Sequence, residues 1–378
     1  MPGGRSWTVT VPSQTSREHV TVISYGVGMN KFLIAVALFG ACGGKKDDGA
    51  GGGPAAKGGG GGAVTLNASG ATFQKPFQEV AIEGFTKANA GIKINYGAGG
   101  SGKGRQDFAD QVVDFACSDA PYKDADVGKV KGGEFFYIPN VLGPITVSYN
   151  LEGVAKLQLS PDVLGKIFQR EIKKWNDPAI AADNAGVTLP DTDIVVARRS
   201  DGSGTTENFT KYLTLAAPDA WKLKSGSTVE WPADTQAGNG NSGVAQIVKS
   251  TKGAVGYVDL SDAKASGLTY AALKNASGAY VEPTVAAATA AGEGIEVKDN
   301  LIFSALNSKA AAAYPITAQS WCLVYAKQTD KAKGTAIVAY FKYMLTDGQS
   351  LLAEIDFAPI PKPLQEKALA QLAKVQVP

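Results

Sequence analysis

Histidine is nearly absent from the chain: one residue, His19, occurs among 378. It precedes the export signal that we identify from Met29 onward, so the mature protein contains no histidine. Catalytic sets of the Ser-His-Asp or Cys-His type would lack their base, and histidine-ligated zinc or iron sites are excluded as well. We therefore expect no enzyme, no metal site and no cofactor.

An excess of charge of either sign is also missing. The chain has 37 lysines and arginines against 35 aspartates and glutamates, which gives a formal net charge of +2. Proteins that bind nucleic acid carry a larger basic excess, because phosphate contacts dominate their affinity. We expect no nucleic-acid partner, and any recognition of an anion must be local.

Cysteine is scarce, and only Cys117 and Cys322 lie beyond the N-terminal region. An exported protein can pair such residues in a disulfide, but their spacing gives no signal for it. We favour two buried thiols, because unpaired cysteine is among the most buried residue types. A disulfide is the alternative.

A short export signal begins at Met29. Residues 29–42 read MNKFLIAVALFGAC, with a lysine near the start, an apolar run and small residues before Cys42. The run is too short to span a bilayer and is typical of a secretory signal. The segment is similar to a bacterial lipoprotein signal, in which Cys42 becomes the lipidated first residue; a cleaved signal with an incidental cysteine is the alternative. Residues 1–28 then represent an over-extended start.

Residues 43–63 are rich in glycine and have no side chains that can build a core. This composition is typical of a flexible tether. A lipid anchor followed by such a tether would hold a globular body near a membrane outside the cytoplasm.

From residue 64 the hydrophobic pattern alternates between strands and helices. Short runs with strand patterning are separated by segments with helical spacing, and in the first of these Phe77, Val80, Ala81 and Phe85 share one face. This rhythm predicts an α/β fold in which helices cover a mainly parallel sheet.

The tripeptide Pro-Ile-Thr occurs twice, at residues 144–146 and 315–317, each time before an alternating strand. A long stretch with its own helices and strands lies between the two copies. We therefore expect one lobe from residues 64–145 plus 315–378 and a second lobe from residues 146–314. The two chain crossings would form a hinge beside a cleft; a chance repeat is the alternative.

Three segments rich in glycine, serine and threonine each precede a helix. Helix N-termini expose unpaired N–H groups, glycine lets the backbone approach a ligand, and hydroxyls add donors, so each segment suits an anion. Taken singly, each is more often a simple helix cap. The segments are SGATFQKPF (69–77), AGGSGKGRQ (98–106) and DGSGTTENF (201–209).

Two features refine this interpretation. Residues 97–103, GAGGSGK, fit the start of a P-loop, but Gly104 stands where the Mg²⁺-binding hydroxyl is required, so nucleotide binding is disfavoured. Arg199 is the strongest candidate for an oxyanion ligand, because guanidinium offers paired donors. Asp201 could hold that guanidinium in position through an ion pair.

Five motifs occur in order along the chain: GATFQKP, VDFACSDAP, EIKKWND, VVARRSDGSGTTENF and GAVGYVDL. Together they resemble a known family, the periplasmic phosphate-binding protein of the bacterial high-affinity phosphate ABC transporter. The resemblance extends from about residue 65 to near the C-terminus. It implies the two-lobed periplasmic binding protein fold, with two hinge strands and a ligand cleft between the lobes. It also implies a monomer that binds inorganic phosphate in the periplasm and delivers it to the membrane subunits of an ABC permease.

The resemblance also implies a set of phosphate ligands. Many relatives have Ser-Gly where this chain has Gly102 and Lys103, which puts an extra lysine near the second loop. The implied ligands are Thr72, Phe73, Ser101, Asp119, Arg199, Ser203, Gly204 and Thr205.

Asp119 is the carboxylate that we expect to select the ligand. A buried carboxylate in an anion site is tolerable only if the ligand brings a proton. Phosphate carries O–H groups at neutral pH whereas sulfate carries none, and a site built on such a bond can reject the other anion by roughly 10⁴–10⁵-fold. The alternative is that Asp119 only caps a turn before Pro121.

Two other functions remain open from the residues. One is an enzyme or binding protein for phosphate esters outside the cell, although the chain offers no histidine base or metal constellation for hydrolysis. The other is a two-lobed receptor, adhesin or signalling protein that keeps this fold for another oxyanion.

Overall fold

The computed structural model describes residues 7–8, 21–22 and 63–378. The chain divides into two units, Met1–Gly59 and Gly60–Pro378, and the described residues from 63 onward form a compact body. In the first unit, β1 (Trp7–Thr8) pairs with β2 (Thr21–Val22) in an antiparallel ribbon. The predicted signal, Cys42 and the tether up to residue 62 lie outside the described residues. In the described part of the chain, no helix is long and apolar enough to cross a membrane.

The second unit is built on a nine-stranded sheet with the order β4-β3-β5-β14-β6-β10-β8-β9, in which β11 also pairs with β6. A smaller three-stranded sheet joins β13, β12 and β7. The strands of the large sheet are β3 (Val64–Gly70), β4 (Ile92–Gly97), β5 (Phe115–Ser118), β6 (Phe135–Tyr149), β8 (Val195–Arg199), β9 (Gln236–Gly238), β10 (Ala254–Asp259), β11 (Thr269–Tyr270) and β14 (Thr317–Tyr325). Those of the small sheet are β7 (Gln158–Leu159), β12 (Ala272–Lys274) and β13 (Tyr280–Val281).

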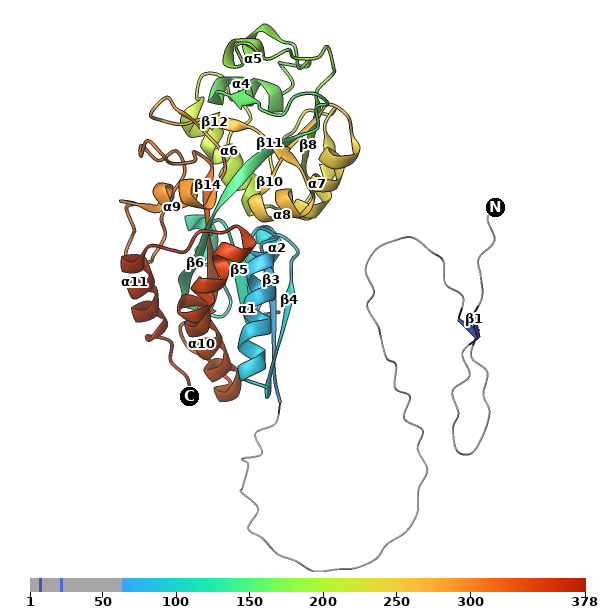
Figure 1. Cartoon of the computed structure of the whole chain (residues 1–378). Helices are drawn as coiled ribbons and strands as arrows, with labels where there is room; N and C mark the ends of the chain where they lie inside the picture. Colours follow the sequence, from blue (N-terminus) through green and yellow to red (C-terminus); the bar gives the residue numbers. More distant parts are fainter. Residues whose placement is uncertain (1–6, 9–20, 23–62) are drawn as a thin grey trace, which may run out of the picture. The chain divides into compact units, whose positions relative to one another are not determined.

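Helices flank this sheet, as Figure 1 shows. They are α1 (Lys75–Ala88), α2 (Ser101–Ala109), α3 (Asp124–Val127), α4 (Pro161–Phe168), α5 (Pro178–Asp183), α6 (Gly204–Ala216), α7 (Gly240–Ser250), α8 (Leu260–Ala265), α9 (Val285–Gly292), α10 (Lys331–Leu345) and α11 (Lys362–Leu372), with a 3₁₀ segment η1 (Asp347–Ile355).

The predicted α/β layering is present, but the expectation of a mainly parallel sheet was wrong. Parallel pairs occupy the two ends, where β3 lies between β4 and β5 and β8 lies between β9 and β10. In the middle, β14 runs antiparallel to both β5 and β6, and β6 runs antiparallel to β10. The βαβαβ rhythm of the first strands does not extend to the long central strands β6 and β14, which pair antiparallel although residues 150–316 separate them in the chain.

Strand β6 changes its partner two thirds of the way along its length. Residues 135–144 pair with β14, and residues 145–149 pair with β10. The two Pro-Ile-Thr tripeptides meet at this point, because Pro144 lies opposite Thr317 and the Ile145 N–H donates to the Ile316 carbonyl at 2.8 Å. In Figure 1 these strands lie between the group of α1, α10 and α11 and the group of α4, α6 and α7.

Local sequence explains the helices that border the later site. Helix α1 has a proline in its first turn and buries Phe77, Ala81 and Phe85 at spacings of four residues, whereas Val80 is only half-buried. Helix α6 begins after Ser203, whose hydroxyl accepts from the Thr206 N–H at 3.0 Å. Such a cap stabilises a helix start by about 1 kcal/mol.

Candidate anion-binding site

The three glycine-rich loops predicted to bind an anion lead into α1, α2 and α6, and the last two meet directly. The Gly102 N–H donates to the Gly202 carbonyl at 2.8 Å, which joins the second loop to the third. A Cβ atom at Gly204 would lie 2.7 Å from Asp119 Oδ2 and still closer to the Ser101 hydroxyl. Only glycine allows this approach, so Gly204 is required for the site as it stands.

Arg199 is held in one position by three side chains. It ends β8, and its side chain is 1% exposed. The Asp201 carboxylate accepts from Nε at 2.8 Å and from Nη2, while Asn241 Oδ1 accepts from Nη1 at 2.7 Å. The Thr205 hydroxyl lies 3.5 Å from the same Nη1. The bidentate ion pair with Asp201 is the arrangement that the sequence predicted for this carboxylate.

Asp201 is anchored in turn by the N-terminus of α7, because the Gly240 N–H donates to its Oδ1 at 3.1 Å. Burial acts to raise the pKa of Asp201, but the hydrogen bonds and charge of Arg199 outweigh it and leave the pKa lowered. Asp201 is therefore ionised at neutral pH and neutralises much of the arginine's charge.

Asp119 lies at the end of β5 and is 1% exposed. Its Oδ1 accepts from the Ser320 hydroxyl at 2.6 Å, and its Oδ2 accepts from the Ser101 hydroxyl at 3.1 Å. Burial raises the pKa of Asp119 to about 6, although these hydrogen bonds and the charges of Arg199 and Arg105 act in the opposite direction. Asp119 can therefore accept a proton near neutral pH.

Thr72 supplies a donor that has no partner within the described structure. Its hydroxyl is buried and unpaired. Its methyl group faces the start of α7, where a Cβ atom at Gly240 would lie 3.4 Å away. A buried polar atom without a partner is costly, so a group that binds here is expected.

Phe73 and Ser203 differ from the other predicted ligands. The Phe73 ring is fully buried and packs edge-on against Phe357 at 5.3 Å, so only its backbone N–H is available to a ligand. The Ser203 oxygen already accepts the capping bond of α6, which leaves its hydroxyl hydrogen free to donate.

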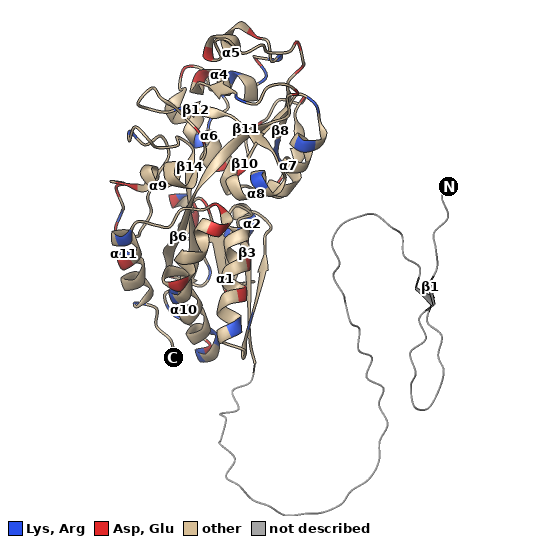
Figure 2. Cartoon of the chain, in the orientation of Figure 1, with Lys and Arg blue, Asp and Glu red and all other residues tan. Residues whose placement is uncertain are grey.

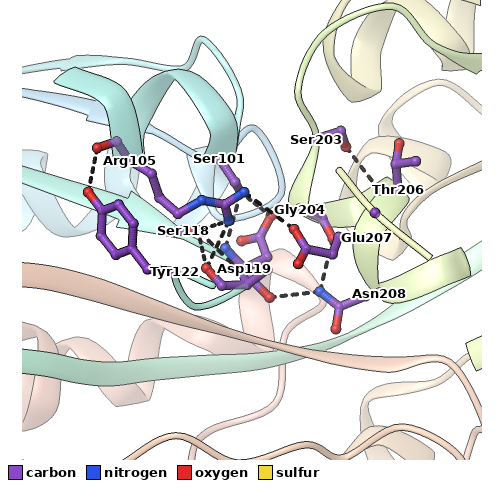
Figure 3. A network of polar contacts seen from close by, with 12 residues as sticks. Ser101, Arg105, Ser118, Asp119, Tyr122, Ser203, Gly204, Thr206, Glu207 and Asn208 are labelled. Atoms are coloured by element: carbon purple, nitrogen blue, oxygen red, sulfur yellow. Dashed lines mark hydrogen bonds and ion pairs between the residues drawn. The ribbon is translucent and has the colours of Figure 1, made fainter. Parts of the chain in front are cut away.

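A polar network joins α2 and β5 to α6 beside Asp119 (Figure 3). Arg105 donates to the Ser118 hydroxyl at 3.0 Å and forms an ion pair with Glu207 at 3.3 Å. Asn208 donates to the Asp119 carbonyl at 2.7 Å. The network fixes the two loops against each other around the Asp119 side chain.

Several residues of this constellation were not predicted from the sequence. Asn241 follows the glycine-rich stretch before α7, which carries the same signal as the three loops, and its amide donates to Asp259 at 2.6 Å. Arg105, Glu207 and Ser320 carry no local signal, because each is one polar residue within a helix or a buried strand. Lys103, the extra lysine near the second loop, pairs with an aspartate one turn along α2 and is 60% exposed.

A cavity of about 630 Å³ lies elsewhere, lined by residues from 122 to 137, 299 to 302 and Gln371. None of the predicted ligands lines it.

Basic and acidic residues are interspersed over the elements drawn in Figure 2, so the local arrangement of Arg199 and Asp119 sets the electrostatics of the site.

Comparison with known proteins identifies the family. A PBP superfamily domain matches residues 55–347. The phosphate-binding protein PstS of Xylella fastidiosa (strain 9a5c) is 36% identical over 319 residues, which cover 82% of this chain and 85% of that protein. PstS of Pasteurella multocida (strain Pm70) is 34% identical over 316 residues, which cover 82% of this chain and 90% of that protein.

A solved structure of a high-affinity periplasmic phosphate-binding protein, PfluDING, bound with phosphate has the same fold. It superposes with a TM-score of 0.68 at 21% identity and covers 81% of this chain and 93% of its own. The predicted fold class, an α/β protein of the two-lobed periplasmic binding type, is thereby confirmed. The chain belongs to the PstS family of phosphate-binding proteins, within the PBP superfamily.

Proposed function

We propose that the protein binds inorganic phosphate outside the cytoplasm and delivers it to the membrane permease of an ABC importer. The names of its PstS relatives support the ligand. The observation that carries the proposal is the buried Arg199 near a carboxylate of raised pKa, Asp119, together with a buried Thr72 hydroxyl that has no partner.

This combination fits an anion that also carries protons. Arg199, the start of α6 and the hydroxyls of Thr72 and Thr205 would donate to phosphate oxygens, whereas the Ser101 hydroxyl already donates to Asp119. Asp119 would accept the O–H group of hydrogen phosphate or dihydrogen phosphate. Sulfate has no O–H group at neutral pH. Its oxygen lone pairs would therefore face the lone pairs of the Asp119 carboxylate and be repelled by them.

The same chemistry leaves one alternative, a receptor for another protonated oxyanion. Arsenate has the charge and O–H groups of phosphate, so competition by arsenate alone does not distinguish the two. We propose no catalytic role, because no histidine follows residue 19 in the sequence and Ser203 serves as a helix cap. Steady release of phosphate from a generic ester by the purified protein would contradict this.

We also propose that residues 64–145 plus 315–378 form one lobe and residues 146–314 the other. The change of partner along β6 after Pro144 supports this division, as does the pairing of the two Pro-Ile-Thr segments at that point. A hinge at two adjacent strands would let the α2 and α6 loops separate to admit the ligand and then close.

Delivery to a permease requires a protein held near the membrane. We propose that residues 29–42 direct export to the periplasm and that Cys42 carries a lipid anchor, with residues 43–63 as the tether. Incorporation of labelled palmitate into wild-type protein but not into Cys42→Ser would test the anchor.

Calorimetric titration tests the ligand. The chain from Gly60 onward is a compact unit, so it can be purified, stripped of ligand by partial unfolding and dialysis, and titrated with phosphate and then with sulfate. We expect one phosphate per chain and sulfate binding weaker by roughly 10⁴-fold or more. Equal affinity for the two anions would overturn the assignment.

A further inference from the structure

The fold brings the two cysteines of the second unit together although they are far apart in the sequence. Cys117 in β5 lies directly opposite Cys322 in β14. Both are free thiols, both are 0% exposed, and their sulfur atoms are 3.0 Å apart. We propose that Cys117 and Cys322 form a disulfide when the protein folds in an oxidising compartment, and that this bond fastens β5 to β14 behind the anion site.

The backbone already has the geometry that a disulfide needs. Directly opposed residues of an antiparallel pair have Cα atoms about 4.5–5.5 Å apart. Disulfides occur at Cα separations of about 4.4–6.8 Å. The two strands can therefore be joined by small side-chain movements, with no change in their register.

The polar side chains that contact the sulfur atoms are uncharged amides. Gln78 Nε2 lies 3.6 Å from both of them, and Asn140 Nδ2 lies 3.2 Å from Cys322 Sγ. Burial raises the pKa of the Cys117 thiol well above its usual range. In the folded protein the Cys117 thiol is thus protonated and both sulfur atoms are shielded from solvent, so the bond must form during folding, before the strand pair is covered.

The reaction is a thiol–disulfide exchange with an external disulfide as the oxidant. One thiolate attacks that disulfide, forms a mixed disulfide and expels one thiol. The second cysteine then attacks the mixed disulfide and expels the other thiol. In total, the two cysteines lose two electrons and two protons, and the oxidant is reduced to two thiols.

The position of this bond connects it to the site. Cys117 precedes Asp119 by two residues, and Cys322 follows Ser320 by two residues. Ser320 donates the 2.6 Å hydrogen bond to Asp119, so the cross-link would join the two strands that hold this donor and acceptor. A buried path also runs from Cys322 through Asn140 and Gln74 to Ser320.

The cross-link would close a loop across 205 residues, and long loops gain the most from a disulfide because the unfolded chain loses the most freedom. A rise in Tm of roughly 5–10 °C is expected for a unit of this size. The predicted gain depends on neither phosphate nor the permease, so failure here would leave the proposed function untouched.

The test is refolding of the full chain, with Cys42→Ser so that only the pair can react, in the presence of reduced and oxidised glutathione or of dithiothreitol alone. We expect the glutathione product to lack free thiols after denaturation and to be lighter by two hydrogen atoms than the reduced product. A proteolytic fragment should link the peptides of Cys117 and Cys322, and Tm should be higher than in the reduced form.

A second variant keeps the result interpretable. Cys117→Ser combined with Cys322→Ser should fold, and its Tm should be the same in both buffers. Free thiols or glutathione adducts on both cysteines of the refolded protein would overturn the proposal. So would a Tm that does not differ between the oxidised and reduced forms.

Discussion

Ser320 donates a hydrogen bond of 2.6 Å to Asp119 from the neighbouring strand, across 201 positions of sequence. Ser101, at the start of α2, donates a hydrogen bond to the other carboxylate oxygen of Asp119. Each carboxylate oxygen has more than one lone pair, so a ligand O–H can still be accepted. The two serines therefore fix the direction of the Asp119 carboxylate without saturating it.

Asp119→Asn should abolish discrimination between phosphate and sulfate. The asparagine amide donates where the carboxylate accepted, so it repels a phosphate O–H and can donate to a sulfate oxygen. We expect phosphate affinity to fall by roughly 10²-fold or more and the sulfate-to-phosphate ratio to move toward unity. Paired titrations measure this. Retention of full discrimination by the variant would show that another group selects the ligand.

The pH dependence of stability gives a second test of the same residue. Asp119 has a pKa of about 6 in the folded protein, above its ordinary value, so the folded state binds the proton more tightly than the unfolded state. Its contribution to stability is present below pH about 4 and is lost as pH rises through about 6. Relative to Asp119→Asn, the ligand-free wild type should lose up to about 3 kcal/mol over this range.

Denaturant unfolding of both proteins at pH 4.5 and pH 8, without phosphate, measures the difference. The comparison removes the contribution of the other carboxylates, since these titrate in both proteins. A wild type that gains stability relative to the variant as pH rises would contradict the raised pKa.

Asn241 offers a test of how Arg199 is positioned. Its amide bridges Arg199 and Asp259, with bonds of 2.7 Å and 2.6 Å, and all three residues are buried. Asn241→Ala leaves both Arg199 and Asp259 without this hydrogen-bond partner. We therefore expect phosphate affinity to fall roughly 10–100-fold and the free energy of unfolding to fall by about 1–3 kcal/mol. Ser242→Ala, at the exposed next position of α7, is the matched control and should change neither quantity. Titration and denaturant unfolding provide the two measurements.

The residues that could be predicted share a local signal. Arg199, Ser203, Gly204 and Thr205 follow one another where a strand turns into a helix, and the chemistry of that turn depends on near neighbours. Asp201 was also predictable as the partner of Arg199, because both lie in the same loop.

The residues that could not be predicted depend on long-range pairing. Ser320 lies within a fully buried strand, where a serine has no distinguishing pattern, and its role arises only when β14 lies beside β5. The proximity of Cys117 and Cys322 has the same origin. The prediction of a mainly parallel sheet was wrong for a related reason, because periodicity identifies strands but not the neighbours with which they pair.

The ion pair between Arg105 and Glu207 should slow the release of phosphate. It joins α2 to α6 across the site, and its side chains are 14% and 21% exposed, so solvent screens it only in part. Glu207→Gln keeps the shape of the side chain but removes the charge, and we expect phosphate to dissociate roughly 3–10-fold faster. The association rate should change less, because the separated loops do not contain this contact. Stopped-flow fluorescence of a labelled protein gives both rates.

Lys103→Gln on the same helix removes an exposed ion pair within α2 and should leave the dissociation rate unchanged. Equal effects of the two substitutions would mean that the Arg105–Glu207 contact has no specific role in holding the loops closed.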